Sequence, residues 1–244
     1  MTDTLAAGAL APGGVLRAVI NLGNAVLARR DTASGALLGV SVDLAQELAR
    51  TLGAQLSLVA VEAAARAVEA VRGDSADIGF FAVDPQRGAG IAFTVPYLRI
   101  EGAYLVRTGS PLQENDQVDR AGVRIVVSQD SAYDLYLGRT IKAAQILRAP
   151  LPTLVMPWFH DTGADVAAGI RPQLQALALH DAGLRLLPGR FMVIEQAMGI
   201  AAGRGAAAEA LLQRFVQHVL ADGFVARSLA HHGQDPAMAA TALP

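Results

Sequence analysis

The apolar run I-G-F-F-A-V at residues 78–83 constrains the fold more than any other stretch of the sequence. Side chains on a strand alternate between two faces, so a strand without polar alternation is buried on both of them. Such strands are typical of parallel sheets that helices cover on both faces. We therefore expect an α/β fold in which this run is a central strand.

The residues before this run supply the crossover pattern that a parallel sheet needs. Strands are expected at residues 15–20 and 55–60. Apolar positions at helical spacing predict one helix from Ser41 to a stop at Gly53 and another over residues 64–72. This β-α-β-α-β order predicts an α/β unit with right-handed crossovers.

A second αβ pattern follows a polar break near residue 110, which suggests two lobes. Helices are expected from Ser131 onward and over residues 206–220, with a short helical tail to about His231. We expect the pair His231 and His232 after that tail to lie on the surface or at the terminus. Further strands are expected at residues 102–107, 123–127, 153–156, 165–168, 184–187 and 191–194.

Composition excludes several classes of protein. With 52% hydrophobic and 17% charged residues, the 244-residue chain can bury a substantial core. A net charge of −2 without a basic stripe makes nucleic acid a poor candidate partner. Charges or glycines interrupt every apolar stretch before the roughly 18 residues of a membrane span, so we expect no membrane insertion.

Cysteine and histidine usage bears on metals, cofactors and compartment. The chain has no cysteine, and none of its five histidines shows zinc-ligand spacing, so we expect no metal or cofactor. The N-terminal residues lack a basic segment followed by a long apolar core, so they do not read as a signal peptide. Either the protein is cytoplasmic, or the sequence starts after a removed leader.

Two local features point to an anion. In S-Q-D-S-A-Y-D, a strand runs into a helix with Ser131 as N-cap and Asp134 as the acid of a capping box. Helix starts at the carboxyl ends of parallel strands offer free N–H groups and a positive dipole to an anion. Arg87 follows the strand at residues 77–83, where a guanidinium can pair with a carboxylate. The alternatives are a helix cap alone and a solvated loop arginine.

The ordered motifs along the chain resemble the amino-acid-type (family 3) extracellular solute-binding proteins of ABC importers. The resemblance extends from about Gly14 to Gly233. It rests on G-V-L-R-A-V-I at 14–20, G-V-S-V-D-L-A-Q-E-L-A-R-T-L-G at 39–53, R-G-D-S-A-D-I at 72–78, R-G-A-G-I-A-F-T-V-P-Y at 87–97, V-R-I-V-V-S-Q-D-S at 123–131, G-A-D-V-A-A at 163–168 and A-D-G-F-V-A-R at 221–227.

This resemblance implies a two-lobed periplasmic-binding-protein-like α/β fold of type II, each lobe a mainly parallel sheet flanked by helices. It places lobe one at 1–101 plus 192–244, lobe two at 108–187, and hinge segments at 102–107 and 188–191. It also implies a monomer that closes over a small carboxylate-bearing solute. ABC permease subunits would be its partners if the protein is extracytoplasmic, which the family's periplasmic location favours.

The resemblance also implies site residues. Arg87, six residues before Phe93, corresponds to the arginine that grips the ligand's carboxylate. Ser131, flanked by Asp130 and Ala132, corresponds to the threonine of a G-T element. Asp130 departs from the glycine of that element and puts an acid beside the anion site.

Other positions depart from the family pattern as well. Asn21, with Asn24 nearby, stands where an acidic or polar residue usually faces the ligand. Members that bind α-amino acids carry an aspartate for the ammonium where this chain has Ile170 or Arg171. If Arg171 points inward, the pocket would favour a second carboxylate. If it points outward, the ammonium lacks its usual partner.

The remaining candidate contacts lie on strands. Because strand side chains alternate, one of Phe80 and Phe81 should face the lobe core and the other the cleft. We take Phe81, with Ala82 beside it, as the ligand contact, although core packing is an equal alternative. Glu195, or the adjacent Gln196, is expected to shape the rest of the site.

Two alternative functions remain open. Cyclohexadienyl or arogenate dehydratases resemble this family, and Glu101 or Glu195 could serve as their general acid, with Arg171 on a second carboxylate. A hinge salt bridge is the simpler interpretation of these glutamates. Without a leader, a cytoplasmic ligand-binding or sensing protein is the other alternative.

Overall fold

The computed structural model describes residues 2–241, except the side chains of residues 2–5, 87 and 88. The chain divides into two compact units, residues 1–99 with 195–244 and residues 100–194. Two strands, β6 (Ile91–Arg107) and β11 (Met192–Ala201), each run from one unit into the other. The segments 102–107 and 188–191, which we expected to be hinges, therefore both lie within the second unit.

The first unit contains the sheet predicted from the apolar run. Its strand order is β4 (Gln55–Val61), β1 (Val15–Asn21), β5 (Ile78–Ala82) and β11. β1 is parallel to both β4 and β5, and β11 is antiparallel to β5. All five β5 residues are buried, as the unbroken apolar pattern predicts for a central strand.

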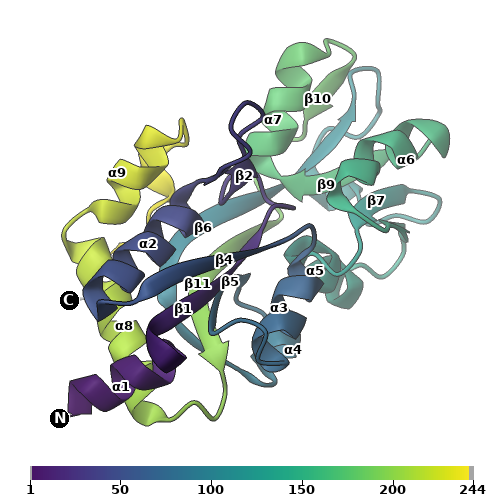
Figure 1. The fold of residues 1–244 in the computed structure, drawn as a ribbon. Helices are drawn as coiled ribbons and strands as arrows, with labels where there is room; N and C mark the ends of the chain where they lie inside the picture. Colours follow the sequence, from purple (N-terminus) through teal and green to yellow (C-terminus); the bar gives the residue numbers. More distant parts are fainter. Residues whose placement is uncertain (1, 242–244) are drawn as a thin grey trace. The chain divides into compact units, whose positions relative to one another are not determined.

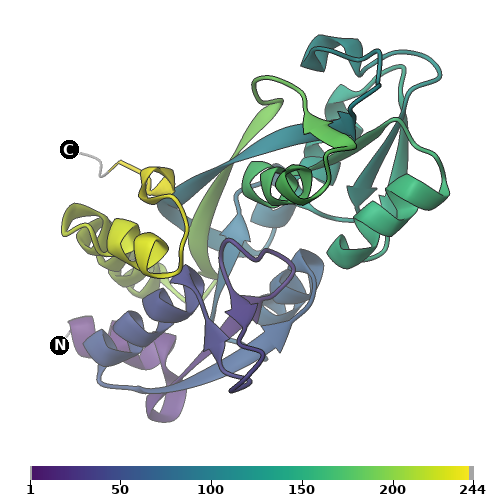
Figure 2. The ribbon, with the colours of Figure 1, turned by 90° about the horizontal axis from the view of Figure 1, so that it is seen from above.

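Helices cover both faces of this sheet, with α2 (Val40–Leu52) and α3 (Ala64–Arg72) on opposite faces (Figure 1). α9 (Phe224–His231) packs against α2. α8 (Ala206–Ala221) packs against α9 and against the N-terminal helix α1 (Thr2–Leu10), as Figure 2 also shows. The sequence pattern predicted four of these five helices and missed α1.

The second unit has its own mixed sheet. Its order is β6, β9 (Val166–Ile170), β7 (Arg124–Ser128) and β8 (Gln145–Ala149), with β10 (Leu184–Leu186) antiparallel to β6. β7 is parallel to β8 and β9, and β6 is antiparallel to β9.

Two hydrophobic clusters hold the helices of the second unit to this sheet. α6 (Val155–Asp161) and α7 (Arg171–His180) contribute Val155, Phe159 and Leu174 to one cluster. α5 (Ala132–Thr140) contributes Leu137 to the other. The apolar sheet residues therefore divide between two helix-covered faces, as in the first unit.

The strand predicted at residues 153–156 is wrong. The chain forms a 3-10 turn at Pro152–Leu154 and continues directly into α6, and the strand lies earlier, at β8. Proline at the first helical position favours this start because its fixed φ is already helical and its missing N–H is not needed there.

The start of α2 also differs from the prediction. The helix begins at Val40, so Ser41 lies inside it and is buried. The residue before the helix is Gly39, whose φ of 129° and close approach to the Leu27 carbonyl leave no room for a Cβ atom.

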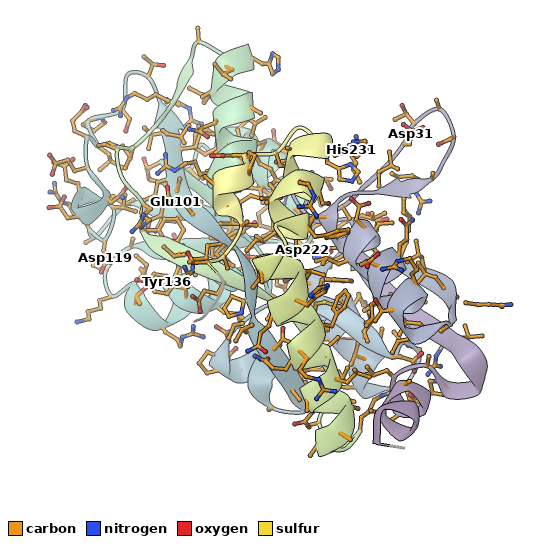
Figure 3. The ribbon with its side chains drawn as sticks, turned by 90° about the vertical axis from the view of Figure 1, so that its left-hand side faces the viewer. Asp31, Glu101, Asp119, Tyr136, Asp222 and His231 are labelled. Carbon is orange, nitrogen blue, oxygen red and sulfur yellow. The ribbon has the colours of Figure 1, made fainter. Side chains whose placement is uncertain are left out.

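Short elements complete the chain. β2 (Arg29–Arg30) and β3 (Leu37–Leu38) form a hairpin whose turn carries Asp31, labelled in Figure 3. α4 (Pro85–Gly88) follows β5. 3-10 turns lie at Pro12–Gly14, Asn115–Gln117 and Pro236–Met238. Among the described residues, no helix combines the length and hydropathy that a membrane span requires.

Candidate functional site

In the first unit, the predicted site residues gather where β1 and β5 end. These strands are parallel neighbours, so their carboxyl ends meet at one edge of the sheet. Asn21 and Asn24 follow β1 and are half-buried. Their side-chain oxygens accept hydrogen bonds from the Gly23 and Val26 amides at 3.0 and 3.2 Å. Both asparagines therefore order the loop at this edge.

Arg87 lies at the same edge, on α4. Asp84 caps this short helix, because its Oδ1 accepts from the Gln86 amide at 2.8 Å, and Pro85 occupies the first position. Arg87 is the third helical residue, but its side chain lies outside the described part of the structure. The contact with a carboxylate thus stays a prediction.

Ala82 and Glu195 lie on neighbouring strands of this unit. Ala82 pairs with Gln196 in the register of β5 and β11, and both residues are buried. The Glu195 carbonyl accepts a hydrogen bond from the Val83 amide at 2.8 Å. Its side chain is 43% exposed and pairs with Arg99 at 3.1 Å. The predicted salt bridge at Glu195 is confirmed.

Phe81 does not present its ring to a ligand. It is 3% exposed in the hydrophobic cluster under α3, where it packs edge-to-face on Phe93. The ring lies over two glycines, Gly79 and Gly199. A Cβ atom added at Gly79 would lie 2.3 Å from the nearest ring atom, and one added at Gly199 would lie 3.0 Å from it. Phe80 is buried on Tyr97, so both phenylalanines are core residues. The core packing given as the equal alternative for Phe81 is therefore what the structure shows.

In the second unit, Ser131 and Arg171 share a sheet edge. β7 and β9 are parallel neighbours, and each leads into a helix at its carboxyl end. α5 begins directly after Ser131, and α7 begins with Arg171. Two helix N-termini therefore lie at one edge of one sheet, which favours anion binding there.

Ser131 is the N-cap of α5, as predicted. Its Oγ accepts a hydrogen bond from the Asp134 amide at 3.1 Å. Asp130, just before it, has a φ of 56°, a region that glycine favours and aspartate tolerates. This explains how an acid stands in place of the glycine expected there. Ala132 is the first helical residue and is half-buried.

Asp134 closes the cap differently from the prediction. Its Oδ2 accepts a hydrogen bond from the Asp130 amide at 2.9 Å. In a capping box this carboxylate would accept instead from the amide of the N-cap residue, Ser131. Its Oδ1 accepts from Arg148 Nε at 2.8 Å, and the residue is 3% exposed. The turn that carries Ser131 is thereby tied to β8. Burial raises the pKa of the Tyr133 hydroxyl, which lies beside Ser131.

Arg171 is bound within the second unit. Its Nε donates to Glu101 Oε2 at 2.6 Å, and its Nη2 donates to the Gly189 carbonyl. Arg190 Nη1 donates to the other oxygen of Glu101 at 2.7 Å. The carboxylate of Glu101, labelled in Figure 3, is therefore shared by two guanidinium groups.

This pairing contradicts the assignment of Glu101 as a general acid. The hydrogen bond from Arg190 and the contact with Arg171 outweigh partial burial and hold the pKa of Glu101 below its usual range. A general acid needs its pKa raised toward the working pH. Glu101 is instead ionised, and the simpler prediction of a salt bridge is confirmed.

Sequence reasoning missed Arg190 and misplaced His232. The only local signal for Arg190 is a charged residue after Pro188 and Gly189, before an apolar strand. His232 is not a surface residue: its side chain is 8% exposed and its Nε2 lies 3.0 Å from Asp43 on α2. In the described part of the chain, no group of three or more histidine, cysteine, aspartate or glutamate residues is arranged to hold a metal ion.

The family model of the bacterial extracellular solute-binding proteins, family 3, matches residues 26–234. A search of curated protein sequences gave no match.

Solved structures of low sequence identity share the fold. The solute receptor for L-cysteine of Neisseria gonorrhoeae is 20% identical over 93% of this chain and 92% of its own, with a TM-score of 0.80. A putative binding component of an ABC transporter from Wolinella succinogenes, complexed with lysine, is 19% identical over 90% and 94%, with a TM-score of 0.76. The ancestral amino-acid-binding protein AncCDT-1, a precursor of cyclohexadienyl dehydratase, is 16% identical over 89% and 95%, with a TM-score of 0.74.

Proposed function

Because the chain belongs to the bacterial extracellular solute-binding proteins of family 3, we propose that it binds a small carboxylate-bearing solute for uptake by an ABC permease. The observation that carries this proposal is the start of α5. There, Ser131 caps a helix at the carboxyl end of a parallel strand, beside the start of a second helix. Such an edge stabilises a carboxylate through helix dipoles and backbone N–H groups.

We propose a role for each site residue, supported by the sheet edge on which it lies. Ser131, with Asp130 and Ala132, receives the carboxylate in the second unit. Arg87 of the first unit supplies a guanidinium for the carboxylate, since a guanidinium binds a carboxylate in bidentate geometry. Four further residues of the first unit shape the remainder: Asn21, Asn24, Ala82 and Glu195.

We propose that binding couples to closure of a monomer, with hinges near the segments 102–107 and 188–191, close to where β6 and β11 pass from one unit into the other. A solute that contacts both units stabilises the closed state by the difference in its affinity for the two states. The permease then distinguishes closed, loaded protein from open, empty protein. The L-cysteine receptor and the lysine-bound transporter component support an amino acid or a related organic acid as the solute.

The identity of the solute is tested by mass spectrometry of small molecules carried through purification. Titration calorimetry with amino acids and dicarboxylates then measures affinity. Arg87→Ala is expected to weaken the best solute roughly tenfold to a hundredfold, as loss of a charge-assisted hydrogen bond does. Arg66→Ala, which removes an exposed arginine of α3, is the control. Unchanged affinity in Arg87→Ala would contradict the carboxylate role of Arg87.

Turnover of a dehydratase substrate distinguishes the enzyme alternative from a binding protein. Glu195 is the remaining candidate acid, because it pairs with one arginine, Arg99, whereas Glu101 pairs with both Arg171 and Arg190 and has a lowered pKa. Incubation with prephenate or arogenate distinguishes binding from catalysis. We expect no phenylpyruvate or phenylalanine to form, and turnover that Glu195→Gln abolishes would establish a dehydratase instead.

A further inference from the structure

Three side chains of the second unit form a charged network beside Ser131. Arg171 is the first residue of α7, which follows β9, and Ser131 lies at the carboxyl end of the neighbouring parallel strand β7. Gly102, next to Glu101 on β6, pairs with Ile170 at the end of β9. Glu101 and Arg171 are thus brought to the edge that carries Ser131.

Arg171 is held in one orientation. Two of its guanidinium nitrogens are engaged, Nε by Glu101 and Nη2 by the Gly189 carbonyl. Its side chain is 22% exposed, whereas the side chain of Arg190 is 57% exposed. A guanidinium fixed by two partners keeps donors for a further acceptor and loses little conformational entropy when it binds one.

The formal charges at this edge nearly balance. One carboxylate, Glu101, serves two guanidinium groups, so the network carries a net positive charge. Two other acids lie at the same edge. Asp134 is buried against Arg148, and Asp130 is exposed before the helix. Asp130 cancels the remaining formal positive charge, so selectivity depends on the fixed direction of the Arg171 donors rather than on net charge.

We infer that Arg171, positioned by Glu101, selects solutes that carry a second acidic group in addition to the carboxylate bound at Ser131. This inference rests on the proposed function and narrows it from carboxylates to acidic solutes with two anionic groups. Arg171 contacts the second group, and Glu101 acts through Arg171 as a positioning residue.

The test compares probes that differ only in that second group. Calorimetry of the purified protein measures its affinity for L-glutamate against L-glutamine and for succinate against succinamate. The acid of each pair is expected to bind about tenfold to a hundredfold more tightly than the amide, since a charge-assisted hydrogen bond replaces a neutral one.

Three single-residue variants test whether Arg171 causes the preference for the acid over the amide. Arg171→Gln is expected to abolish the acid-over-amide preference while amide affinity changes only a few-fold. Glu101→Gln should reduce the preference partially, because Arg171 remains but is less well oriented. Arg120→Gln is the control, since it removes an exposed arginine of the second unit that does not contact this network, and it should leave the preference unchanged.

The outcomes separate this inference from the proposed function. If acids and amides bind the parent protein equally, or if Arg171→Gln keeps the preference, the inference is wrong and the proposed function stands. If none of the four probes binds the parent but another carboxylate-bearing solute does, the inference is wrong and the proposed function stands; if no carboxylate-bearing solute binds, both are wrong. The parent comparison needs no variant, so poor folding of Arg171→Gln does not prevent a decision.

Discussion

Asp77 shows how much one buried charge contributes to the first unit. It is fully buried, and Arg17 and Arg204 contact its carboxylate at 2.7 and 2.8 Å. Burial opposes its ionisation, but the hydrogen bonds from Arg17 and the charge of Arg204 outweigh it and hold the pKa of Asp77 below its usual range. The carboxylate joins β1 to the segments before β5 and after β11.

We expect Asp77→Asn to lower the free energy of unfolding by about 3 kcal/mol at pH 7, since it removes the buried partner of two guanidinium groups, which then keep only the exposed carboxylate of Asp74. Because the folded-state pKa of Asp77 is depressed, its contribution is present above the unfolded value of about 3.9 and is lost as pH falls through the folded value. Urea unfolding should show the variant and the parent converging below about pH 4. Asp74→Asn, at a carboxylate whose side chain is 77% exposed, is the control and should cost less than about 1 kcal/mol. A pH-independent difference would contradict this account.

Ser131 combines two roles that substitutions can separate. Ser131→Ala removes the acceptor for the Asp134 amide and should cost about 1 kcal/mol of stability as well as solute affinity. Ser131→Asp keeps a good N-cap, so stability should hold, but its carboxylate should repel an anionic solute and reduce affinity by tenfold or more. Thermal melting and calorimetry measure the two effects. Full affinity in Ser131→Asp would exclude carboxylate binding at this position.

At the scale of single residues, the sequence predicted Ser131 as an N-cap because capping is a local property of the chain. It could not predict the partners of Arg171 or His232. Glu101 lies 70 residues from Arg171, and Asp43 lies 189 residues from His232, so nothing near either residue encodes its partner. Arg87 remains a prediction from spacing and strand position.

At the scale of elements, local patterns predicted most strands and helices, and α3 was predicted with the bounds it has. The failure at residues 153–156 has a physical cause. A short apolar run is compatible with a buried strand or a buried helix, and Pro152 decides for the helix. Alternation of strand side chains predicted that one of Phe80 and Phe81 faces the cleft, but both are buried. Glycines on β5 and β11 leave space for the Phe81 ring within the core.

The packing of Phe81 gives a prediction for β5. Gly79→Ala places a Cβ 2.3 Å from the Phe81 ring, so the ring must leave its position, at a cost of about 1–3 kcal/mol. Urea unfolding measures this loss. Gly109→Ala is the control, since nothing lies within 4 Å of its Cβ, and it should change stability by less than about 0.5 kcal/mol. In a double-mutant cycle, Phe81→Leu should relieve part of the Gly79→Ala penalty. Additive effects would show that the ring is not the obstacle.

At the scale of the whole molecule, binding should appear as stabilisation and compaction. Solute at 100 times its Kd should raise the free energy of unfolding by about 2.7 kcal/mol, because it binds only the folded state. Small-angle X-ray scattering should show a smaller radius of gyration with the best solute than without it. Stabilisation without compaction would support binding and contradict closure.

The two units are built differently along the chain, and this difference affects the order in which they are completed. Residues 100–194 form one uninterrupted segment, so the second unit has all its strands and helices as soon as that segment has emerged from the ribosome or a translocation pore. The first unit is completed later, because it includes residues 195–244. Its central strand β5 stays without its neighbour β11, and α2 without α9, until the last fifty residues arrive. A chain stalled before that point would leave the wholly apolar strand β5 at an open sheet edge, so the C-terminal segment governs when the nascent chain ceases to be a target for chaperones.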